Sequence, residues 1–311
     1  MNIRMLIRKL IGRRGVFFIR NLLATITTSF GIVDAEKEGK ENGITAMVCS
    51  FNEEEWIRLS LLSIKDIVDE YLVIDSSTDK TPQILEELRE EGLPIKLYRM
   101  PPGDLAKARN FALQKARYRW ILVWDADFVA TEKLTKTIKM LVESLNTKYY
   151  YLIYWPYIRF CGDIYHVCTP PFHIEHWLYT WSKKLKYVWI DKFEGLIAPL
   201  HMYKAIYINE PLGYHFCYVR RPDRLYFKYV WWKYRELVDE LLRTNPKKAI
   251  EFARQIALKE YGTKDLCKAG LRLIKELTRH MERYDERKFG PLPQDIVDYY
   301  HKNILRCANP L

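Results

Sequence analysis

The chain has 311 residues, of which 49% are hydrophobic and 29% charged, and its formal net charge is +11. These values exclude a disordered chain and allow one large domain or two smaller ones. The basic excess favours anionic partners such as nucleotide phosphates or acidic lipid head groups, and by itself leaves nucleic acid open.

Residues 1–33 combine basic and apolar side chains, with no acidic residue among them. The apolar run 22–33 is too short and too polar to span a bilayer, and no small-residue cleavage site follows it. Two interpretations remain for residues 4–33. One is a basic amphipathic helix that lies on an anionic membrane surface, and the other is a helix packed on the next domain. Residues 34–43 are expected to form a charged linker.

Apolar runs then alternate with helical patterns every 25–30 residues. This alternation predicts βαβ units with right-handed crossovers, and therefore an α/β fold with a parallel sheet flanked by helices. Asn52 is expected to cap the helix after the first strand. The expected buried strands are 44–51, 70–75, 95–100 and 120–127.

Polar side chains stand where these strands end: Asn52 and Glu53, then Asp75, then Asp125 and Asp127. Carboxyl ends of parallel strands meet at one edge of the sheet, where open α/β folds bind ligands. Two carboxylates one residue apart repel each other unless a cation lies nearby, and Mg2+ or Mn2+ suits such oxygen ligands. The alternative is an ordinary strand end with solvated acids.

Glycine-rich phosphate-binding sequences are absent: the chain has neither Gly-x-Gly-x-x-Gly nor Gly-x-x-x-x-Gly-Lys-Ser/Thr. The usual sequence arguments for a dinucleotide oxidoreductase or a P-loop nucleotidase therefore fail. A phosphate ligand would depend on a metal and on Arg or Lys side chains.

Four segments carry a family resemblance, namely CSFNEE, VIDSSTDKT, AKARNFAL and WILVWDADF, in this order within residues 44–145. Together they resemble the family 2 glycosyltransferases of the GT-A fold. The resemblance implies an NDP-sugar donor and Mn2+ or Mg2+ as cofactor. It also implies the donor-binding residues, which are Ser50, Phe51, Asn52, Glu53, Asp75, Arg109, Asn110 and Asp125.

In that resemblance Asp127 binds the metal that bridges the diphosphate, and a late histidine, here His215, completes the metal site. A carboxylate some 60–90 residues after the metal motif acts as base in many family members, which points to Asp191 or Glu194. The chain departs from one branch of the family, because Ala198 and Pro199 stand where a His-Glu pair is expected.

The second half is expected to bind the acceptor. Its predicted parts are an aromatic strand over 149–157, a hairpin over 160–168 and an irregular segment over 170–181. Residues 221–311 are expected to be helical. The aromatic and basic segment 220–236 suits either a membrane head-group region or packing on the sheet.

The six cysteines are scattered and form no Cys-x-x-Cys pair, so no zinc site is expected. They are predicted to be mostly reduced, in a cytoplasmic protein that contacts the membrane peripherally, with a Cys161–Cys168 bridge as an alternative. Plentiful Lys, Glu and Arg with few Gln are typical of a thermophilic source.

Three regions are thus predicted: an N-terminal segment and linker (1–43), a GT-A domain with donor half 44–145 and acceptor half 146–220, and a C-terminal helical region (221–311). The function predicted is a metal-dependent, inverting transfer of a sugar to a glycan or lipid-linked acceptor. The alternatives are a polyprenyl-phosphate glycosyl synthase and a non-catalytic sugar-nucleotide or glycan-binding protein. Nucleic acid is not expected as a partner.

Overall fold

The computed structural model describes residues 3–190 and 193–307. Its helical segments, in chain order, are α1 (Ile3–Ser29), η1 (Ala35–Glu38), α2 (Ile57–Leu62), α3 (Thr81–Glu90), α4 (Leu105–Lys115), α5 (Glu132–Ser144), α6 (Pro222–Lys233), α7 (Arg235–Thr244), α8 (Pro246–Glu260), α9 (Leu266–Arg279), α10 (Glu286–Phe289), α11 (Gln294–Tyr299) and η2 (Tyr300–Ile304). Its strands are β1 (Glu41–Ser50), β2 (Glu70–Asp75), β3 (Ile95–Arg99), β4 (Tyr118–Asp125), β5 (Phe128–Ala130), β6 (Tyr150–Cys161), β7 (Asp163–Thr180), β8 (Lys186–Ile190), β9 (Phe193–Ile197), β10 (Tyr203–Tyr207), β11 (Gly213–Tyr218) and β12 (Glu282–Arg283).

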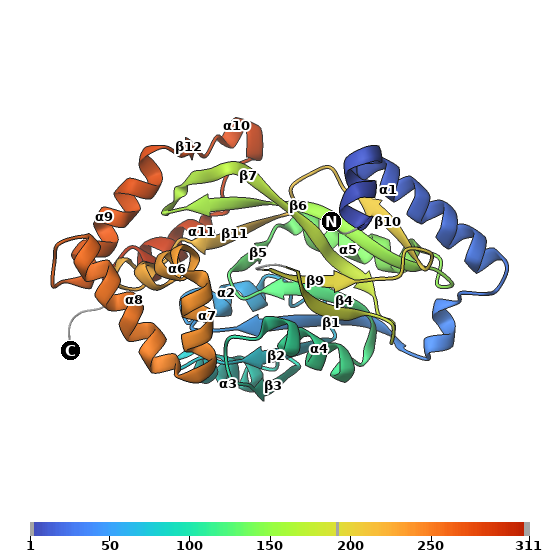
Figure 1. Ribbon diagram of the computed structural model, residues 1–311, viewed down its shortest axis with the longest axis horizontal. Helices are drawn as coiled ribbons and strands as arrows, with labels where there is room; N and C mark the ends of the chain where they lie inside the picture. The colour runs from blue at the N-terminus through green and yellow to red at the C-terminus, as the bar shows by residue number, and fades with distance from the viewer. Residues whose placement is uncertain (1–2, 191–192, 308–311) are drawn as a thin grey trace.

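One curled sheet forms the centre of the molecule, with strand order β3-β2-β1-β4-β7-β6-β11-β5, and β10 and β12 pair with β6 and β7 (Figure 1). Strands β3, β2, β1 and β4 are parallel, as the alternating pattern predicts. Beyond β4 the sheet is mixed, because β7 runs antiparallel to both β4 and β6. Strands β8 and β9 make a separate two-stranded hairpin.

The parallel strands are continuous apolar runs because both of their faces are covered. Every residue of β2 is buried, and β4 is buried from Arg119 to Trp124. Helix α4 packs against β1 and β2, and α3 contacts β3. Burial of each large aliphatic side chain here contributes about 1.5–3 kcal/mol to folding. The core therefore fixes where these strands end.

The register of the parallel strands brings their polar ends together. Ser50 at the end of β1 lies opposite Asp75 of β2, and Cys49 lies opposite Asp125 of β4. The predicted ligand-binding edge thus has its polar side chains on adjacent strands.

The prediction of an irregular segment over 170–181 is wrong. Strand β7 runs to Thr180 and pairs with β6 along much of its length. The register shifts from Ile158↔Phe172 to Phe160↔Val167, so Pro170 and Pro171 fall in a bulge where no ladder hydrogen bond is required. The hairpin predicted around Gly162 and Asp163 is confirmed.

The C-terminal region is helical, as predicted, but the aromatic helix breaks at Tyr234 into α6 and α7. Helix α6 packs on α8 and α9. Gly270 of α9 makes the closest approach, since a Cβ there would lie 1.7 Å from the carbonyl oxygen of Pro222. The two helices can meet at this distance only because the residue is glycine.

Helix α1 lies against β10, where the Asn21 amide donates to the carbonyl of Ala205 (3.1 Å) and accepts from its N–H (2.6 Å). The helix is kinked at Gly12, where φ is +66°. Across the described ranges, no helix has the length and apolar character needed to cross a bilayer. The expected linker is itself attached to the domain, because Glu38 accepts a hydrogen bond from Tyr150 Oη (3.0 Å).

Cys267 and Cys307 form a disulfide, which the cysteine spacing did not predict. The alternative Cys161–Cys168 bridge is wrong, because both of these cysteines are free and buried. The two cysteines are 40 residues apart, so no local sequence pattern indicates that they form a disulfide.

Gly270→Ala tests the close approach of α9 to α6. We expect the free energy of unfolding to fall by about 1–3 kcal/mol, because the added methyl group forces the helices apart. Urea unfolding measures the change. Leu271→Ala, at a half-exposed side chain on the same helix, is the control and should have little effect. An unchanged or raised stability of Gly270→Ala, as at an unconstrained helical glycine, would contradict the packing described.

Candidate active site

Asp75 is the innermost acid at the sheet edge and is fully buried. Its Oδ1 accepts hydrogen bonds from Ser50 Oγ (2.7 Å) and Ser77 Oγ (2.6 Å), while Oδ2 forms an ion pair with Arg99. These partners fix the orientation of the carboxylate. A buried, ionised acid at this point offers a strong acceptor to a ribose hydroxyl or a base N–H.

Asn52 links the loops that follow β1 and β2. Its backbone is left-handed, with φ of 57°, a conformation that Asn tolerates. Its Oδ1 accepts from the N–H groups of Thr78 (2.8 Å) and Asp79 (3.3 Å). The prediction that Asn52 caps the next helix is therefore wrong, since α2 begins at Ile57.

Arg109 stands between two acids from different parts of the chain. Its Nη2 lies 3.2 Å from Asp125 Oδ1, and its Nε lies 3.3 Å from Glu194 Oε1 on β9. The guanidinium is buried, and within the described part of the chain nothing accepts a hydrogen bond from Nη1. The structure thus brings three of the predicted site residues together, and Nη1 is a buried donor with neither a hydrogen bond nor an ion pair in the described residues.

Asn110, the next residue of α4, has a different role from Arg109. Its amide nitrogen donates to the carbonyl of Tyr187 (2.8 Å), and its oxygen accepts from the Tyr187 N–H (2.8 Å). Both polar atoms of the side chain are therefore engaged with the backbone of β8. Asn110 holds the β8–β9 hairpin against α4, and its side chain is not directed to a ligand.

Asp127 lies in the turn between β4 and β5, and three positive or protonatable groups surround it. Arg220 Nη2 is 2.7 Å and Lys228 Nζ 3.1 Å from Oδ2, and His215 Nε2 is 3.4 Å from Oδ1. Although burial opposes ionisation, Lys228, His215 and Arg220 hold the pKa of Asp127 well below its usual range. Burial alone would lower the pKa of His215, but Cys217 and Asp127 raise it to about 10.

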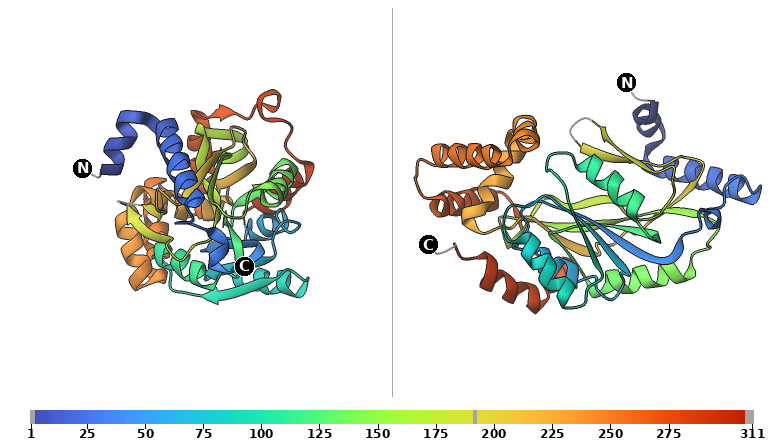
Figure 2. Two further views of the ribbon diagram at one scale, coloured as in Figure 1. Left: turned by 90° about the vertical axis from the view of Figure 1, so that its right-hand side faces the viewer. Right: turned by 90° about the horizontal axis from the view of Figure 1, so that it is seen from below.

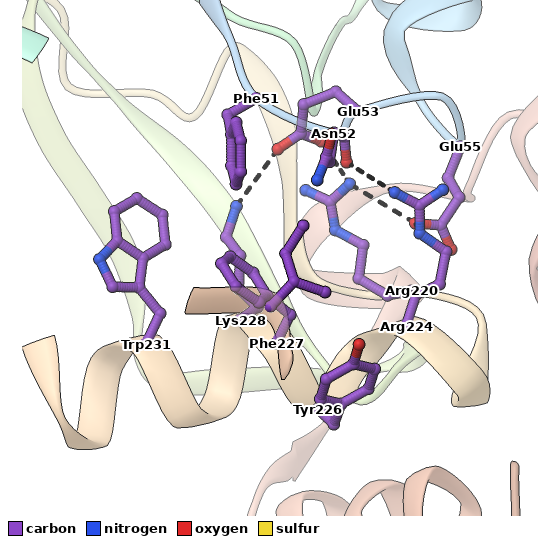
Figure 3. Close-up of a pocket in the computed structure, with 11 residues that line it drawn as sticks. Phe51, Asn52, Glu53, Glu55, Arg220, Arg224, Tyr226, Phe227, Lys228 and Trp231 are labelled. Carbon is purple, nitrogen blue, oxygen red and sulfur yellow. Dashed lines mark hydrogen bonds and ion pairs between the residues drawn. The ribbon is translucent and has the colours of Figure 1, made fainter. Parts of the chain in front are cut away.

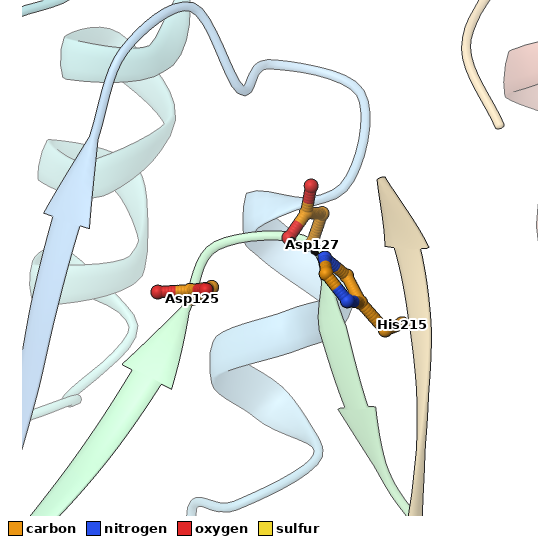
Figure 4. A group of neighbouring side chains, drawn as sticks. All are labelled: Asp125, Asp127 and His215. Carbon is orange, nitrogen blue, oxygen red and sulfur yellow. Dashed lines mark ion pairs between the residues drawn. The ribbon is translucent and has the colours of Figure 1, made fainter. Parts of the chain in front are cut away.

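Asp125, Asp127 and His215 form a group that could hold a metal ion (Figure 4). One ligand atom from each lies within 4.8 Å of the others. Two carboxylates and an imidazole are a suitable donor set for a divalent ion such as Mn2+. Because Arg220 and Lys228 already contact Asp127, an ion bound there would replace part of these contacts, and the donor set itself fits a metal site.

Arg220 and Lys228 are the site residues that the sequence did not indicate. Arg220 is 4% exposed and pairs with Glu53 as well as Asp127, and Lys228 Nζ lies 3.5 Å from Glu53 Oε1 (Figure 3). Arg220 lies in the corner between β11 and α6, and Lys228 lies on α6. The Arg-Arg-Pro-Asp-Arg run at 220–224 was the available signal, but a basic run is equally typical of a solvated surface.

A cavity of about 180 Å³ opens beside this ion-pair network. Phe51, Phe227 and Trp231 form one wall, with the Phe51 and Phe227 ring centroids 5.8 Å apart. Glu53, Arg220, Arg224 and Lys228 form the polar wall (Figure 3). Aromatic faces next to cations suit a flat base joined to phosphate. Phe51, Asn52 and Glu53, all predicted from the sequence, line this cavity.

Strand β7 adds Glu175 near the cleft. Its carboxylate pairs with His176 (3.4 Å). Trp177, on the same strand, packs on Phe128, which in turn packs on the ring of His215. The proline pair at 170–171 concealed this strand in the sequence. Asp191, the other predicted base, lies outside the described residues.

Arg220→Met tests the buried ion pairs. The substitution leaves Glu53 and Asp127 close together, so we expect the unfolding free energy to fall by about 3–5 kcal/mol, near the lower value because Lys228 remains. Urea unfolding measures it. Arg117→Met is the control, because Arg117 and its partner Glu41 are more than half exposed and solvent screens that pair. Equal effects of both variants would contradict a buried network.

Sequence comparison identifies the family. A family profile described as "Glycosyl transferase family 2" matches residues 45–207, just over half of the chain. A protein of Rickettsia bellii described as "Uncharacterized glycosyltransferase" is 33% identical over 108 residues, covering 34% of this chain and 35% of that protein. The lipopolysaccharide core biosynthesis glycosyltransferase LpsC of Rhizobium meliloti is 26% identical over 102 residues, covering 33% and 36%. The chain spans less than half the length of these curated relatives.

Two solved structures show limited similarity. TarS 1–349 of S. aureus in complex with UDP-GlcNAc has a TM-score of 0.39 and 17% identity, over 75% of this chain and 71% of that one. Glucosyl-3-phosphoglycerate synthase of Mycobacterium tuberculosis with Mn2+ and UDP has a TM-score of 0.29 and 21% identity, over 40% and 46%. The family assignment rests on the sequence match and not on these low scores.

The predicted GT-A fold class is confirmed by the parallel strands, the polar strand ends and the C-terminal helices, in a chain whose sequence matches the family profile over residues 45–207. The chain belongs to glycosyl transferase family 2.

Proposed function

We propose that this protein transfers a sugar from a nucleoside diphosphate sugar to an acceptor. The observation that carries the proposal is the arrangement around Asp127: two carboxylates and an imidazole that could hold a metal, with Arg220 and Lys228 beside them. An acidic group alone would repel a diphosphate. The same group with Arg220 and Lys228 can accept one.

The donor is proposed to lie along the edge formed by β1, β2 and β4. Phe51 and the aromatic wall of α6 would contact the base, and Asp75 would accept from the base or ribose. Ser50, Asn52 and Glu53 shape this part of the cleft. Arg220 and Lys228 would bind the diphosphate, exchanging their contacts with Asp127 for contacts with phosphate oxygens.

Mn2+ or Mg2+ is proposed as cofactor, held by Asp127 and His215 with help from Asp125. When bound, such an ion withdraws charge from the departing phosphate as a Lewis acid. Asp125 is also proposed to accept from ribose or sugar hydroxyls, with Arg109 holding its carboxylate in place through the 3.2 Å contact.

The transfer is proposed to invert the anomeric carbon. The acceptor oxygen attacks that carbon, the bond to the diphosphate oxygen breaks, and the acceptor proton passes to a carboxylate. Glu194 is the candidate base that the structure describes, and its contact with Arg109 orients it. Asp191, three residues earlier in the sequence, remains the alternative.

The acceptor is proposed to be a glycan or a lipid-linked sugar, with two alternatives. A polyprenyl phosphate acceptor is already ionised, so transfer to it would persist in both Asp191→Asn and Glu194→Gln. A non-catalytic sugar-nucleotide or glycan-binding protein would bind donors without turnover across a panel of acceptors. Assays of the wild type with each acceptor class separate the three.

Asp127→Asn tests the metal role. With the wild type we expect Mn2+ and a matching NDP-sugar to raise the melting temperature, since a ligand at about 100 times its Kd adds about 2.7 kcal/mol. The variant should lose the metal-dependent part of this rise. Asp295→Asn, at an exposed acid, should keep it. Full metal-dependent stabilisation of Asp127→Asn would exclude Asp127 as a ligand.

Glu194→Gln tests the base. We expect kcat to fall by about 100- to 10,000-fold because the proton acceptor is lost, while donor-induced stabilisation persists. The control is Glu143→Gln, at an exposed glutamate of α5. If Glu194→Gln retains its activity and Asp191→Asn or Glu175→Gln loses it, the assignment of Glu194 is wrong.

A further inference from the structure

Helix α1 has an apolar stripe that no other described part of the chain covers. Phe18, Leu22 and Ile26 are 70%, 50% and 42% exposed, and their spacing of four residues places them on one side of the helix. Ala24 and the hydrogen-bonded Asn21 belong to the side that packs on β10. The helix therefore needs only one of its sides to stay attached to the domain.

The exposed apolar surface continues past the end of the helix. Phe30 and Ile32 are 78% and 72% exposed. Single exposed apolar side chains are normal, but these five and Ile19, six within fifteen residues, form a segment of the kind that contacts a partner.

The charge of the same segment indicates the chemistry of that partner. Residues 1–33 contain basic side chains and no acids, the six basic residues being Arg4, Arg8, Lys9, Arg13, Arg14 and Arg20. A helix with exposed apolar residues and many arginines matches a bilayer surface with anionic head groups, where apolar side chains enter the acyl boundary and arginines meet phosphates. A second copy of this chain would bring like charges together.

In the other segment considered for membrane contact, 220–236, basic side chains pair with acids of the protein. Arg220, Arg224 and Lys228 pair with acids of the cleft. Its cations are therefore not available to lipid head groups, and α1 is the better candidate.

The placement of α1 agrees with a membrane-side role. Both views of Figure 2 show its N-terminal turns on the same side of the central sheet as the β8–β9 hairpin. That hairpin exposes Trp189, Ile190 and Phe193 next to the candidate base. A surface that binds α1 would therefore lie on the side from which an acceptor reaches Glu194.

We propose that α1 docks the protein peripherally on an anionic bilayer through Phe18, Leu22 and Ile26, with the basic charge of residues 4–20 supplying the attraction to the head groups. This contact is separate from sugar transfer and can be measured without a substrate.

Co-sedimentation of the full chain with vesicles tests the proposal. We expect binding to phosphatidylcholine vesicles that contain phosphatidylglycerol, and much weaker binding to phosphatidylcholine alone. Phe18→Gln/Leu22→Gln/Ile26→Gln should bind at least about tenfold more weakly. The matched control is Met140→Gln/Leu271→Gln, at exposed apolar residues of α5 and α9. Circular dichroism verifies that all variants are folded.

Two charge-reversal variants distinguish the effect of the charge on α1 from the effect of the overall net charge. Arg14→Glu and Arg279→Glu change the net charge equally at exposed residues, and only Arg14→Glu should weaken vesicle binding. The proposal is overturned if the wild type does not bind anionic vesicles, or if the triple variant binds them as strongly as the wild type. It is also overturned if the stripe instead forms a dimer that the triple variant dissociates, as seen by analytical ultracentrifugation.

Discussion

The arrangement of the site depends on one buried interaction, the placement of Arg220 between Glu53 and Asp127. Two acids from the ends of β1 and β4 cannot both stay ionised and buried without a cation between them. The cation comes from the corner where the sheet ends and the C-terminal helices begin. These ion pairs join the predicted donor half to the residue just before α6, and the contact of Lys228 with Asp127 extends them to α6 itself.

The parts of the fold that follow from local patterns could be predicted. Asp75, Asp125 and Asp127 each follow an apolar run, and in a parallel sheet the ends of such runs meet at one edge. The same reasoning could not reach Arg220, which lies 93 residues after Asp127 and approaches it only through the packing of α6. Nor could it assign Asn110, since the partner of its side chain is the backbone of Tyr187.

Prolines explain another wrong prediction from the sequence, that of an irregular segment over 170–181. Pro170 and Pro171 suggested an irregular segment, but the bulge removes them from the hydrogen-bond ladder and the strand continues on either side. The net charge of +11 also hides two separate populations. Some cations, such as Arg220 and Lys228, neutralise acids inside the molecule, while others lie along α1. A count of charges does not distinguish these, although they serve different partners.

Two adjacent residues of α4 have different roles. Arg109 contacts Asp125 and Glu194 of the cleft, whereas Asn110 binds the backbone of Tyr187 and so holds the β8–β9 hairpin. One rigid helix thus sets the spacing between the sugar-nucleotide side and the acceptor side. Side chains at Trp189, Ile190 and Phe193, beyond Tyr187 on the hairpin, could therefore be exchanged without altering this spacing. Under the proposed function, such an exchange would change which molecule receives the sugar and leave the donor pocket intact.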